Sequence, residues 1–301
     1  MIAPPTRRGT ALVAALTVAL LALPTIALSR GNTLTLPSEG QPVVLLLLGS
    51  DDGPPRDANP LTSRADAFHI LSVSGDRQSA VFVSLPRDSW IPVTGSGTTK
   101  INACLTRGPE NCVSTVESEF GIEVDGYIIT SMWGFAEAVN AFVGCPEGPD
   151  TPCDTGLLVD VQDPCDANCG GPPIPTAGEQ PLTGYQALSY ARHRKTRPGG
   201  DFSRSQAQAR ILALAHADVH DNGGLIRTME AVRILRRHSV TDLDTTTLAR
   251  LALESLSLPP ENVVLEFVPS RGGTVGAASV VFLEPGAYPL ITDAADGRLG
   301  N

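Results

Sequence analysis

The chain has 301 residues, 42% of them hydrophobic, and a formal net charge of −10. This length and apolar content are sufficient for one domain with a buried core, and they exclude a largely disordered protein. The acidic balance argues against nucleic-acid binding, which needs a basic surface, so any local cluster of basic residues requires its own explanation.

The first segment is predicted to anchor the protein in a membrane. Arg7 and Arg8 precede an uncharged, mostly apolar run over residues 9–28, which as a helix would span a hydrocarbon core of about 30 Å. The two arginines predict that residues 1–8 stay in the cytoplasm and that the body is extracytoplasmic. A cleaved signal peptide is the alternative, and it would export the body as well. Residues 29–41 then form a linker.

Three apolar runs at the start of the domain predict neighbouring β-strands. The runs cover residues 43–48, 68–73 and 80–85. A turn at residues 74–76 joins the second and third runs as a hairpin. If all three share one sheet, the end of the first strand, the start of the second and the end of the third lie at one edge. We therefore expect Asp51, Asp66 and Arg87 to meet there.

Strands and helices alternate along the rest of the domain, which we place at residues 42–290, with a tail at 291–301. The predicted strands cover residues 126–130, 157–161, 263–268 and 280–283. The predicted helices cover residues 132–142, 205–217, 225–235 and 244–256. A further short helix begins at Thr183, where Gln186 completes a capping box. This alternation predicts an α/β sandwich.

An insertion over residues 144–175 is rich in Cys, Pro and Gly and contains four of the six cysteines. An even number of cysteines in an exported chain predicts disulfides. We expect Cys104 to pair with Cys112, and the pairing of the other four stays open. A metal site at Cys165 and Cys169 is less favoured, because no histidine lies near them in the sequence.

A basic cluster interrupts the acidic chain. Six of the 22 Lys and Arg residues lie between Arg192 and Arg210, in the stretch RHRKTRPGGDFSRSQAQAR. A solvated basic face, with Arg192 and Arg194 offsetting the dipole at a helix end, is the simpler interpretation. We favour an anion site, because guanidinium groups bind phosphate oxygens in bidentate fashion and stay charged at any working pH. The cluster therefore predicts a clamp for a diphosphate.

Asp51 and Asp66 supply the acidic half of the predicted site. Either could be a simple turn or cap residue, but together at one sheet edge they could hold Mg²⁺, which takes one or two carboxylates, water and substrate phosphate. The sequence contains no Walker, Ser-His-Asp or HExxH pattern. Phosphoryl transfer needs mainly positioning and charge stabilisation from the protein, so it is compatible with this set of residues.

Several short motifs, taken in order, resemble the LytR-CpsA-Psr family of cell-wall glycopolymer ligases. The motifs are LLLLGSD, SRAD, SLPRDSW, KINAC, LTGYQALSYARHR and GGDFSR, within residues 43–217. The resemblance implies an α/β/α sandwich with a central mixed sheet, a hydrophobic groove for a polyprenyl chain and an N-terminal anchor. It also implies Mg²⁺-dependent transfer of a glycopolymer, as a phosphodiester, from a polyprenyl diphosphate carrier to muramic acid in peptidoglycan.

Carried over by motif, the resemblance implies a role for each residue of the site. Asp51 and Asp66 resemble the family's magnesium ligands. Arg87 resembles its catalytic arginine, and Asp88 lies beside it. Asp201 resembles an acid that orients an arginine or accepts a proton. The residues that resemble the diphosphate clamp are Arg64, Lys100, Arg192, Arg194, Arg204 and Gln208.

Two positions depart from the family's pattern. Ala67 stands where Thr is common, and Ala207 stands where an arginine often precedes the glutamine. The lost arginine would weaken the clamp or change the substrate preference. A pyrophosphatase that releases the lipid carrier and a non-catalytic scaffold for lipid or wall polymer are the alternative functions. The identity of the glycopolymer is left open.

Overall fold

The computed structural model describes residues 37, 40–50, 63–149, 153–165, 170–193 and 201–299, without the side chains of residues 201, 202 and 223. The predicted membrane anchor, residues 9–28, lies outside these ranges. Within them, no helix combines the length and the apolar character needed to cross a bilayer.

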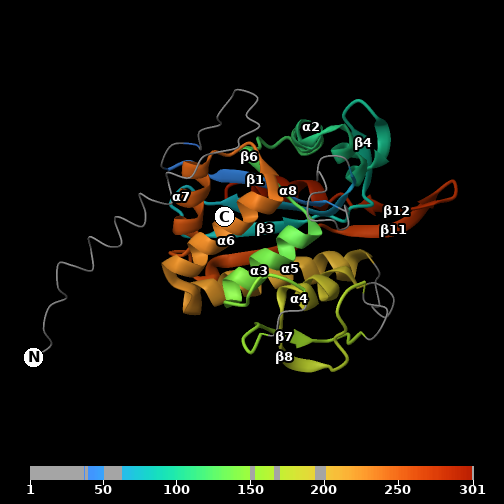
Figure 1. Ribbon diagram of the computed structural model, residues 1–301. Helices are drawn as coiled ribbons and strands as arrows, with labels where there is room; N and C mark the ends of the chain where they lie inside the picture. The colour runs from blue at the N-terminus through green and yellow to red at the C-terminus, as the bar shows by residue number, and fades with distance from the viewer. Residues whose placement is uncertain are drawn as a thin grey trace, which may run out of the picture.

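A six-stranded mixed sheet forms the centre of the molecule, in the order β10-β3-β2-β1-β6-β9 (Figure 1). Its strands are β1 (Val43–Ser50), β2 (Ala65–Val73), β3 (Ala80–Ser84), β6 (Gly126–Thr130), β9 (Ser239–Thr241) and β10 (Val263–Phe267). β1 pairs antiparallel with β2 and β2 antiparallel with β3, whereas β6 runs parallel to β1 and β10 parallel to β3. The predicted up-down-up arrangement of the first three strands is therefore confirmed.

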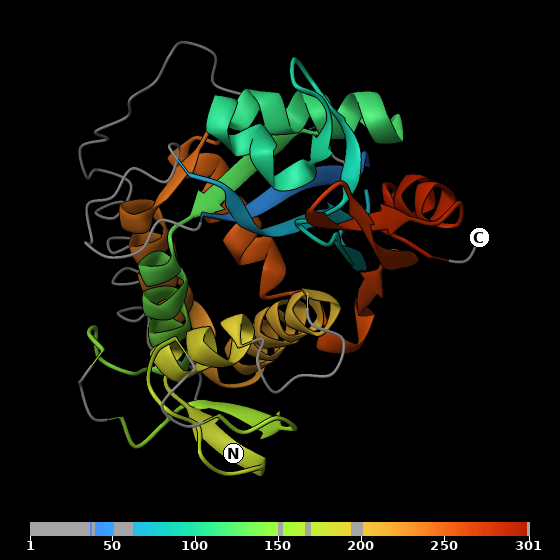
Figure 2. The same cartoon turned by 90° about the vertical axis from the view of Figure 1, so that its right-hand side faces the viewer.

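Helices cover both faces of this sheet, so the sandwich is also confirmed. The helices are η1 (Ile101–Arg107), α2 (Pro109–Phe120), α3 (Met132–Val143), α4 (Gly184–Arg192), α5 (Asp201–Asp218), η2 (Val219–Gly223), α6 (Gly224–His238), α7 (Thr245–Ser255), η3 (Pro260–Asn262) and α8 (Ala287–Ala294). η1, α2 and α8 lie on one face. In Figure 2 the green α2 lies on one side of the strands and the gold α5 on the other.

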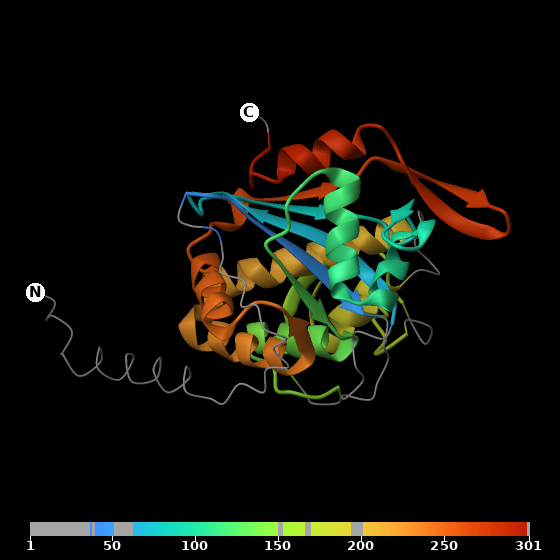
Figure 3. The same ribbon diagram turned by 90° about the horizontal axis from the view of Figure 1, so that it is seen from above.

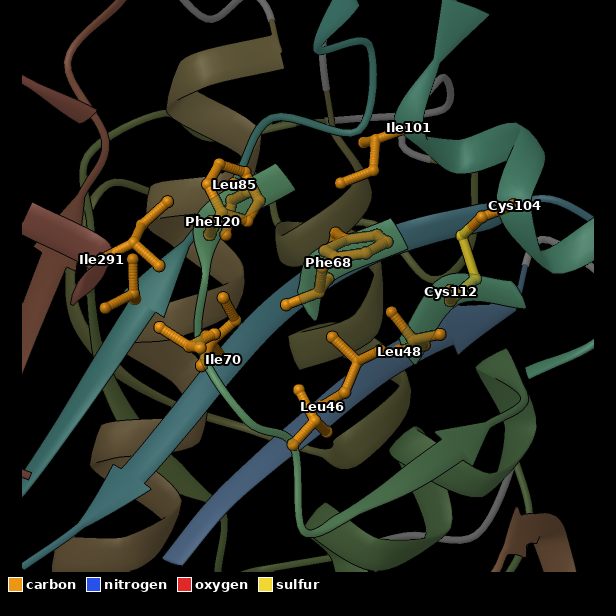
Figure 4. Close-up of a cluster of buried hydrophobic side chains, with 14 of the residues drawn as sticks. Leu46, Leu48, Phe68, Ile70, Leu85, Ile101, Cys104, Cys112, Phe120 and Ile291 are labelled. Atoms are coloured by element: carbon orange, nitrogen blue, oxygen red, sulfur yellow. A yellow bond between two sulfur atoms is a disulfide. The ribbon is translucent and has the colours of Figure 1, made fainter. Parts of the chain in front are cut away.

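The face toward α2 is a packed hydrophobic core. Leu46, Leu48, Phe68 and Ile70 project from β1 and β2 into this core and are 2% exposed or less (Figure 4). Alternate residues of a strand point to opposite faces, so the residues between these four face the helices on the other side. The predicted Cys104–Cys112 disulfide joins η1 to α2 within the core.

Local signals set the ends of two helices as predicted. The Thr183 side chain accepts a hydrogen bond from the Gln186 amide at 3.3 Å, and the Gln186 side chain accepts one from the Thr183 amide at 3.0 Å. The Asp244 carboxylate accepts from the Thr247 amide at 2.7 Å at the start of α7. These bonds satisfy backbone donors that a helix leaves free in its first turn.

The cysteine-rich insertion forms a separate hairpin against α4 and α5. Its strands are β7 (Leu157–Val161) and β8 (Gly178–Leu182), and a Cys145–Cys153 disulfide closes the loop that leads into it. Cys165 is disulfide-bonded as well, while Cys169 lies outside the described residues. The apolar side of the hairpin packs on residues of α4 and α5, which explains how a polar insertion is held on the domain.

Several elements were not predicted from the sequence. They include η1, α2, the hairpin of β4 (Trp90–Val93) and β5 (Gly97–Lys100), and strand β11 (Ser270–Val275), which forms a second hairpin with β12 (Ala278–Leu283), the strand predicted at 280–283. The second hairpin projects from the body in Figure 3. Helix α8 crosses residue 290, the predicted end of the domain, and buries Ile291 and Ala294 in the core. The packed body therefore extends beyond that boundary.

Candidate active site

Asp66 and Arg87 meet at the edge of the sheet where β1 and β3 end and β2 begins. Their side chains form an ion pair between Asp66 Oδ1 and Arg87 Nη1, with exposed fractions of 21% and 16%. The predicted convergence is confirmed for these two residues. Asp51, the third expected member, lies outside the described residues, but Ser50 before it ends β1 and pairs with Ala65 after a register shift at Gly49.

A second ion pair extends this cluster. Lys100 Nζ lies 3.2 Å from Asp88 Oδ1, and Arg87 Nε lies 3.9 Å from the same oxygen. The four side chains therefore alternate in charge, from Asp66 through Arg87 and Asp88 to Lys100. Such pairs are partly exposed, so an incoming diphosphate can compete with the carboxylates for the two cations.

Hydrogen bonds hold the backbone of this loop in place. The Asp88 carbonyl accepts from the Val281 amide of β12 at 2.9 Å, and the Arg87 carbonyl accepts from the Asn102 amide of η1 at 3.1 Å. The Ser89 carbonyl accepts from the Ile101 amide at 2.8 Å. Strand β12, which was predicted in part, and helix η1, which was not, thus fix the loop that carries Arg87 and Asp88.

Helix α5 brings two further predicted residues to the face of the sheet opposite α2. Arg204 and Gln208 are four positions apart and therefore share one helix face. They are 2% and 9% exposed. Arg192 lies at the end of α4, where its Nη1 donates to the Gly170 carbonyl at 3.3 Å. Arg64 is exposed immediately before β2.

Besides Asp51, two predicted site residues lie wholly or partly outside what the structure describes. Arg194 is outside the described ranges, and so is the side chain of Asp201, although Asp201 is the first residue of α5. The predicted helix at 205–217 therefore begins earlier than its apolar pattern suggested.

An apolar cavity of about 430 Å³ opens beside these residues, between the sheet and helices α3, α5, α6 and α7. Asp66, Arg192 and Gln208 lie among its lining residues. Its apolar wall includes Leu45, Leu47, Leu71, Ile128, Phe135, Val139, Phe142, Leu212, Val232, Leu248, Leu251 and Leu265. The hydrophobic groove implied by the family resemblance, with walls from the helices predicted at 132–142 and 205–217, is thus present.

His69 is a residue of this cavity that sequence reasoning missed. It projects from β2, is 2% exposed, and its Nδ1 lies 3.0 Å from Ser84 Oγ. Burial, reinforced by the nearby Arg204 guanidinium, lowers the pKa of His69 to about 3. The ring is therefore neutral at physiological pH. A polar residue inside the apolar run FHIL is the only signal in the sequence that marks it.

The described donors fit a magnesium ion that is held mainly by its substrate. Mg²⁺ commonly takes one or two carboxylates and completes its shell with phosphate oxygens and water. Asp66 supplies one partly exposed carboxylate beside the cations. Among the described residues, no three His, Cys, Asp or Glu side chains gather as a metal cage.

The chain matches known proteins along most of its length. A model of the LytR_cpsA_psr family matches residues 25–293. The polyisoprenyl-teichoic acid–peptidoglycan teichoic acid transferase TagU of Oceanobacillus iheyensis is 28% identical over 244 residues, which are 79% of this chain and 70% of that one. The corresponding TagV of Bacillus subtilis is 30% identical over 195 residues, 62% of this chain and 47% of that one. The alignment thus spans about half of TagV.

Solved structures share the fold. The crystal structure of B. subtilis TagT has a TM-score of 0.69 and 19% sequence identity, with 92% of this chain and 100% of that chain covered. A structure of TagT bound to LIIa-WTA has a TM-score of 0.70 and 20% identity over the same shares. At this level of identity, the likeness establishes the architecture.

Proposed function

This chain belongs to the LytR_cpsA_psr family, and we propose that it transfers a glycopolymer from a polyprenyl diphosphate carrier to a muramic acid hydroxyl of peptidoglycan. The observation that carries the proposal is the alternating charge cluster of Asp66, Arg87, Asp88 and Lys100, which adjoins an apolar cavity through Asp66. Such a site matches a ligand with a charged head and a long apolar tail.

The cavity would hold the prenyl tail and the sheet edge the diphosphate. Apolar side chains line the cavity on the sheet and on four helices, and burial of a hydrocarbon there is favourable by about 25 cal/mol per Å². The head then lies against Asp66, Gln208 and Arg192 at the polar end. Tail burial thus positions the reacting phosphorus next to Arg87.

Arg87 would stabilise the negative charge that develops on the phosphoryl oxygens. Its guanidinium is always charged and can bind two oxygens at once. Lys100, paired with Asp88, and Arg204, buried on α5, would add positive charge, which is most effective when it is positioned before the reaction begins. Mg²⁺, held by Asp66 and by the predicted ligand Asp51, would neutralise the diphosphate when bound.

The transfer forms one bond and breaks one bond. The muramic acid oxygen attacks the phosphorus nearest the glycopolymer, and the bond from that phosphorus to polyprenyl phosphate breaks, with its electron pair leaving on the phosphate. The hydroxyl proton passes to a carboxylate. Asp88 is placed beside Arg87 for this role, and Asp201 is the second candidate.

The proposal predicts that Arg87→Ala abolishes transfer and leaves the fold intact. The measurement is polymer transfer to peptidoglycan by the purified protein, with a prenyl diphosphate-linked glycan as donor and with and without Mg²⁺. Arg271→Ala is the matched control, since Arg271 is exposed on β11 over the Phe282 ring, away from the cavity.

Normal transfer by Arg87→Ala would show that the assignment is wrong. If phosphate appears free in solution instead of attached to muropeptide, the protein is a pyrophosphatase. Binding of the donor with no Mg²⁺-dependent turnover would favour the scaffold.

We also propose that the body works outside the cytoplasmic membrane, anchored by residues 9–28. Support comes from the arginines before that segment and from the disulfides at Cys104–Cys112 and Cys145–Cys153, which form in oxidising compartments. Protease added outside intact cells should digest the body, whereas protection would contradict this location.

A further inference from the structure

An ion pair lines the apolar cavity beyond the end of β2 that lies away from Asp66. Arg77 Nε lies 3.2 Å from Glu254 Oε2, and the two side chains are 14% and 25% exposed. Both residues line the apolar cavity, and both also line a second, polar pocket of about 660 Å³. The other residues of that pocket are Gly40, Pro42, Gly75, Asp76, Arg250, Asp296 and Arg298. The pair therefore lies between the apolar cavity and a pocket lined mainly by charged residues.

The sheet sets the distance between this pair and the charged cluster. Asp66 lies at the start of β2, and Arg77 follows the end of β2 at Val73. At about 3.3 Å per residue, the seven steps from Asp66 to Val73 span roughly 23 Å. The cavity thus runs along the sheet from the diphosphate end to the Arg77–Glu254 pair.

The backbone at Arg77 is unusual. Its φ of 58° makes it the one non-glycine residue with a positive φ in the described part of the chain. Glycine or asparagine would adopt this conformation at lower cost. The side chain makes several contacts, because Nη1 donates at 3.0 Å to both the Gln41 and Ser74 carbonyls while Nε faces Glu254. Strain of this kind is retained where a side chain has a defined task.

Glu254 is fixed from the other side. It lies on α7, where Leu248 and Leu251 line the cavity, and its Oε1 accepts from Arg250 Nε at 2.7 Å. Two guanidinium groups therefore hold one carboxylate at the cavity end. A hydrocarbon pressed against this pair would displace the water that still contacts the two charged groups. The cost of removing that water would offset the favourable free energy of burying the hydrocarbon.

We infer that the Arg77–Glu254 pair is the floor of the lipid cavity and limits the length of prenyl tail that the protein encloses. This inference rests on the proposed function. Isoprene units that reach the pair add no further burial, whereas units above it each bury apolar surface. Replacing the pair with apolar side chains joins the cavity to the second pocket and lengthens the enclosed space.

The test is a series of binding measurements with prenyl diphosphates from farnesyl to undecaprenyl. For the unchanged protein, each added unit should raise affinity by about tenfold or more until the tail reaches the floor, after which affinity should level off. The Arg77→Met/Glu254→Met variant should bind the longest tails at least about tenfold more tightly and level off later. Arg298→Met is the matched control, because Arg298 lines only the polar pocket, and it should leave the plateau unchanged.

A second variant tests the floor without removing the charged pair. Ala80 lies in register with Val73, is 1% exposed and lines the same end of the cavity. Ala80→Leu should therefore move the plateau to shorter tails. An identical length dependence in the unchanged protein and both cavity variants would overturn the inference alone, and the proposed function would stand. Absence of binding at every tail length would overturn both.

Discussion

His69 is buried where the cavity meets the charged end of the site, and its titration should be measurable in the stability of the protein. The unfolded chain binds a proton at this residue below about pH 6.5, whereas the pKa of the folded state is about 3. Stability is therefore full above pH 6.5 and is lost as pH falls toward 3. Each pH unit in this window changes the free energy of unfolding by about 1.4 kcal/mol.

The comparison that isolates this effect uses His69→Gln. Urea unfolding at pH 6.5 and pH 5 should show that the unchanged protein loses about 2 kcal/mol more than the variant over this interval, since glutamine has no proton to gain. Carboxylates contribute equally to both proteins and cancel in the difference. Parallel pH dependence in the two proteins would contradict the low pKa of His69.

The positions of individual site residues could be predicted where the strands that carry those residues could be predicted. Asp66 and Arg87 could be brought together because two apolar runs and a short turn define the hairpin between them. The contact of Lys100 with Asp88 could not be predicted, because it depends on the β4–β5 hairpin, whose strands are short and contain exposed polar residues and a proline. His69 was missed because one polar residue does not alter the periodicity of a buried strand.

At the scale of elements, the cysteine-rich insertion should depend on its disulfide. Cys145 and Cys153 close a short loop, and such a cross-link stabilises a protein by about 2–3 kcal/mol through the unfolded chain. We expect Cys145→Ser/Cys153→Ser to lower the free energy of unfolding in urea by that amount. Loss of less than about 0.5 kcal/mol would show that the hairpin is held by its packing on α4 and α5 alone.

Elements with a regular apolar pattern could be predicted, and those without one could not. The helices predicted at 132–142 and 244–256 match α3 and α7 closely, because apolar spacing and a cap agree. Helix α2 has a mixed sequence, PENCVSTVESEF, and is defined mainly by Pro109 at its start and by the left-handed Gly121 at its end. Strand β8, GEQPL, is mostly polar and forms only because β7 pairs with it.

At the scale of the whole molecule, the cavity links ligand binding to stability. A lipid that binds only the folded state at a concentration one hundred times its Kd should stabilise the protein by about 2.7 kcal/mol. A prenyl diphosphate should therefore raise Tm, and a prenyl alcohol of equal length should raise it less, because we propose that Arg87 and Lys100 bind the diphosphate. Equal shifts, measured by calorimetry, would show that the charged cluster takes no part in binding.

The layered architecture followed from the alternation of strands and helices, but the cavity did not. A strand that faces a cavity has the same apolar sequence as one that faces a packed core, as LLLL in β1 illustrates. Only the resemblance to a family pointed to a groove. The space itself depends on how far α3, α5, α6 and α7 stand from the sheet, and their separation is set by long-range packing.

Strand β1 separates the packed core from the apolar cavity, so its two faces are under different constraints. Leu46 supports the packed interior, so trimming it to alanine should leave a void and weaken the protein. Its neighbour Leu47 lines the apolar cavity on the other face, where the same change mainly alters the shape of the cavity. Substitutions on the cavity face of β1 can therefore change which ligands the cavity fits. Residues on the core face meanwhile keep the fold stable.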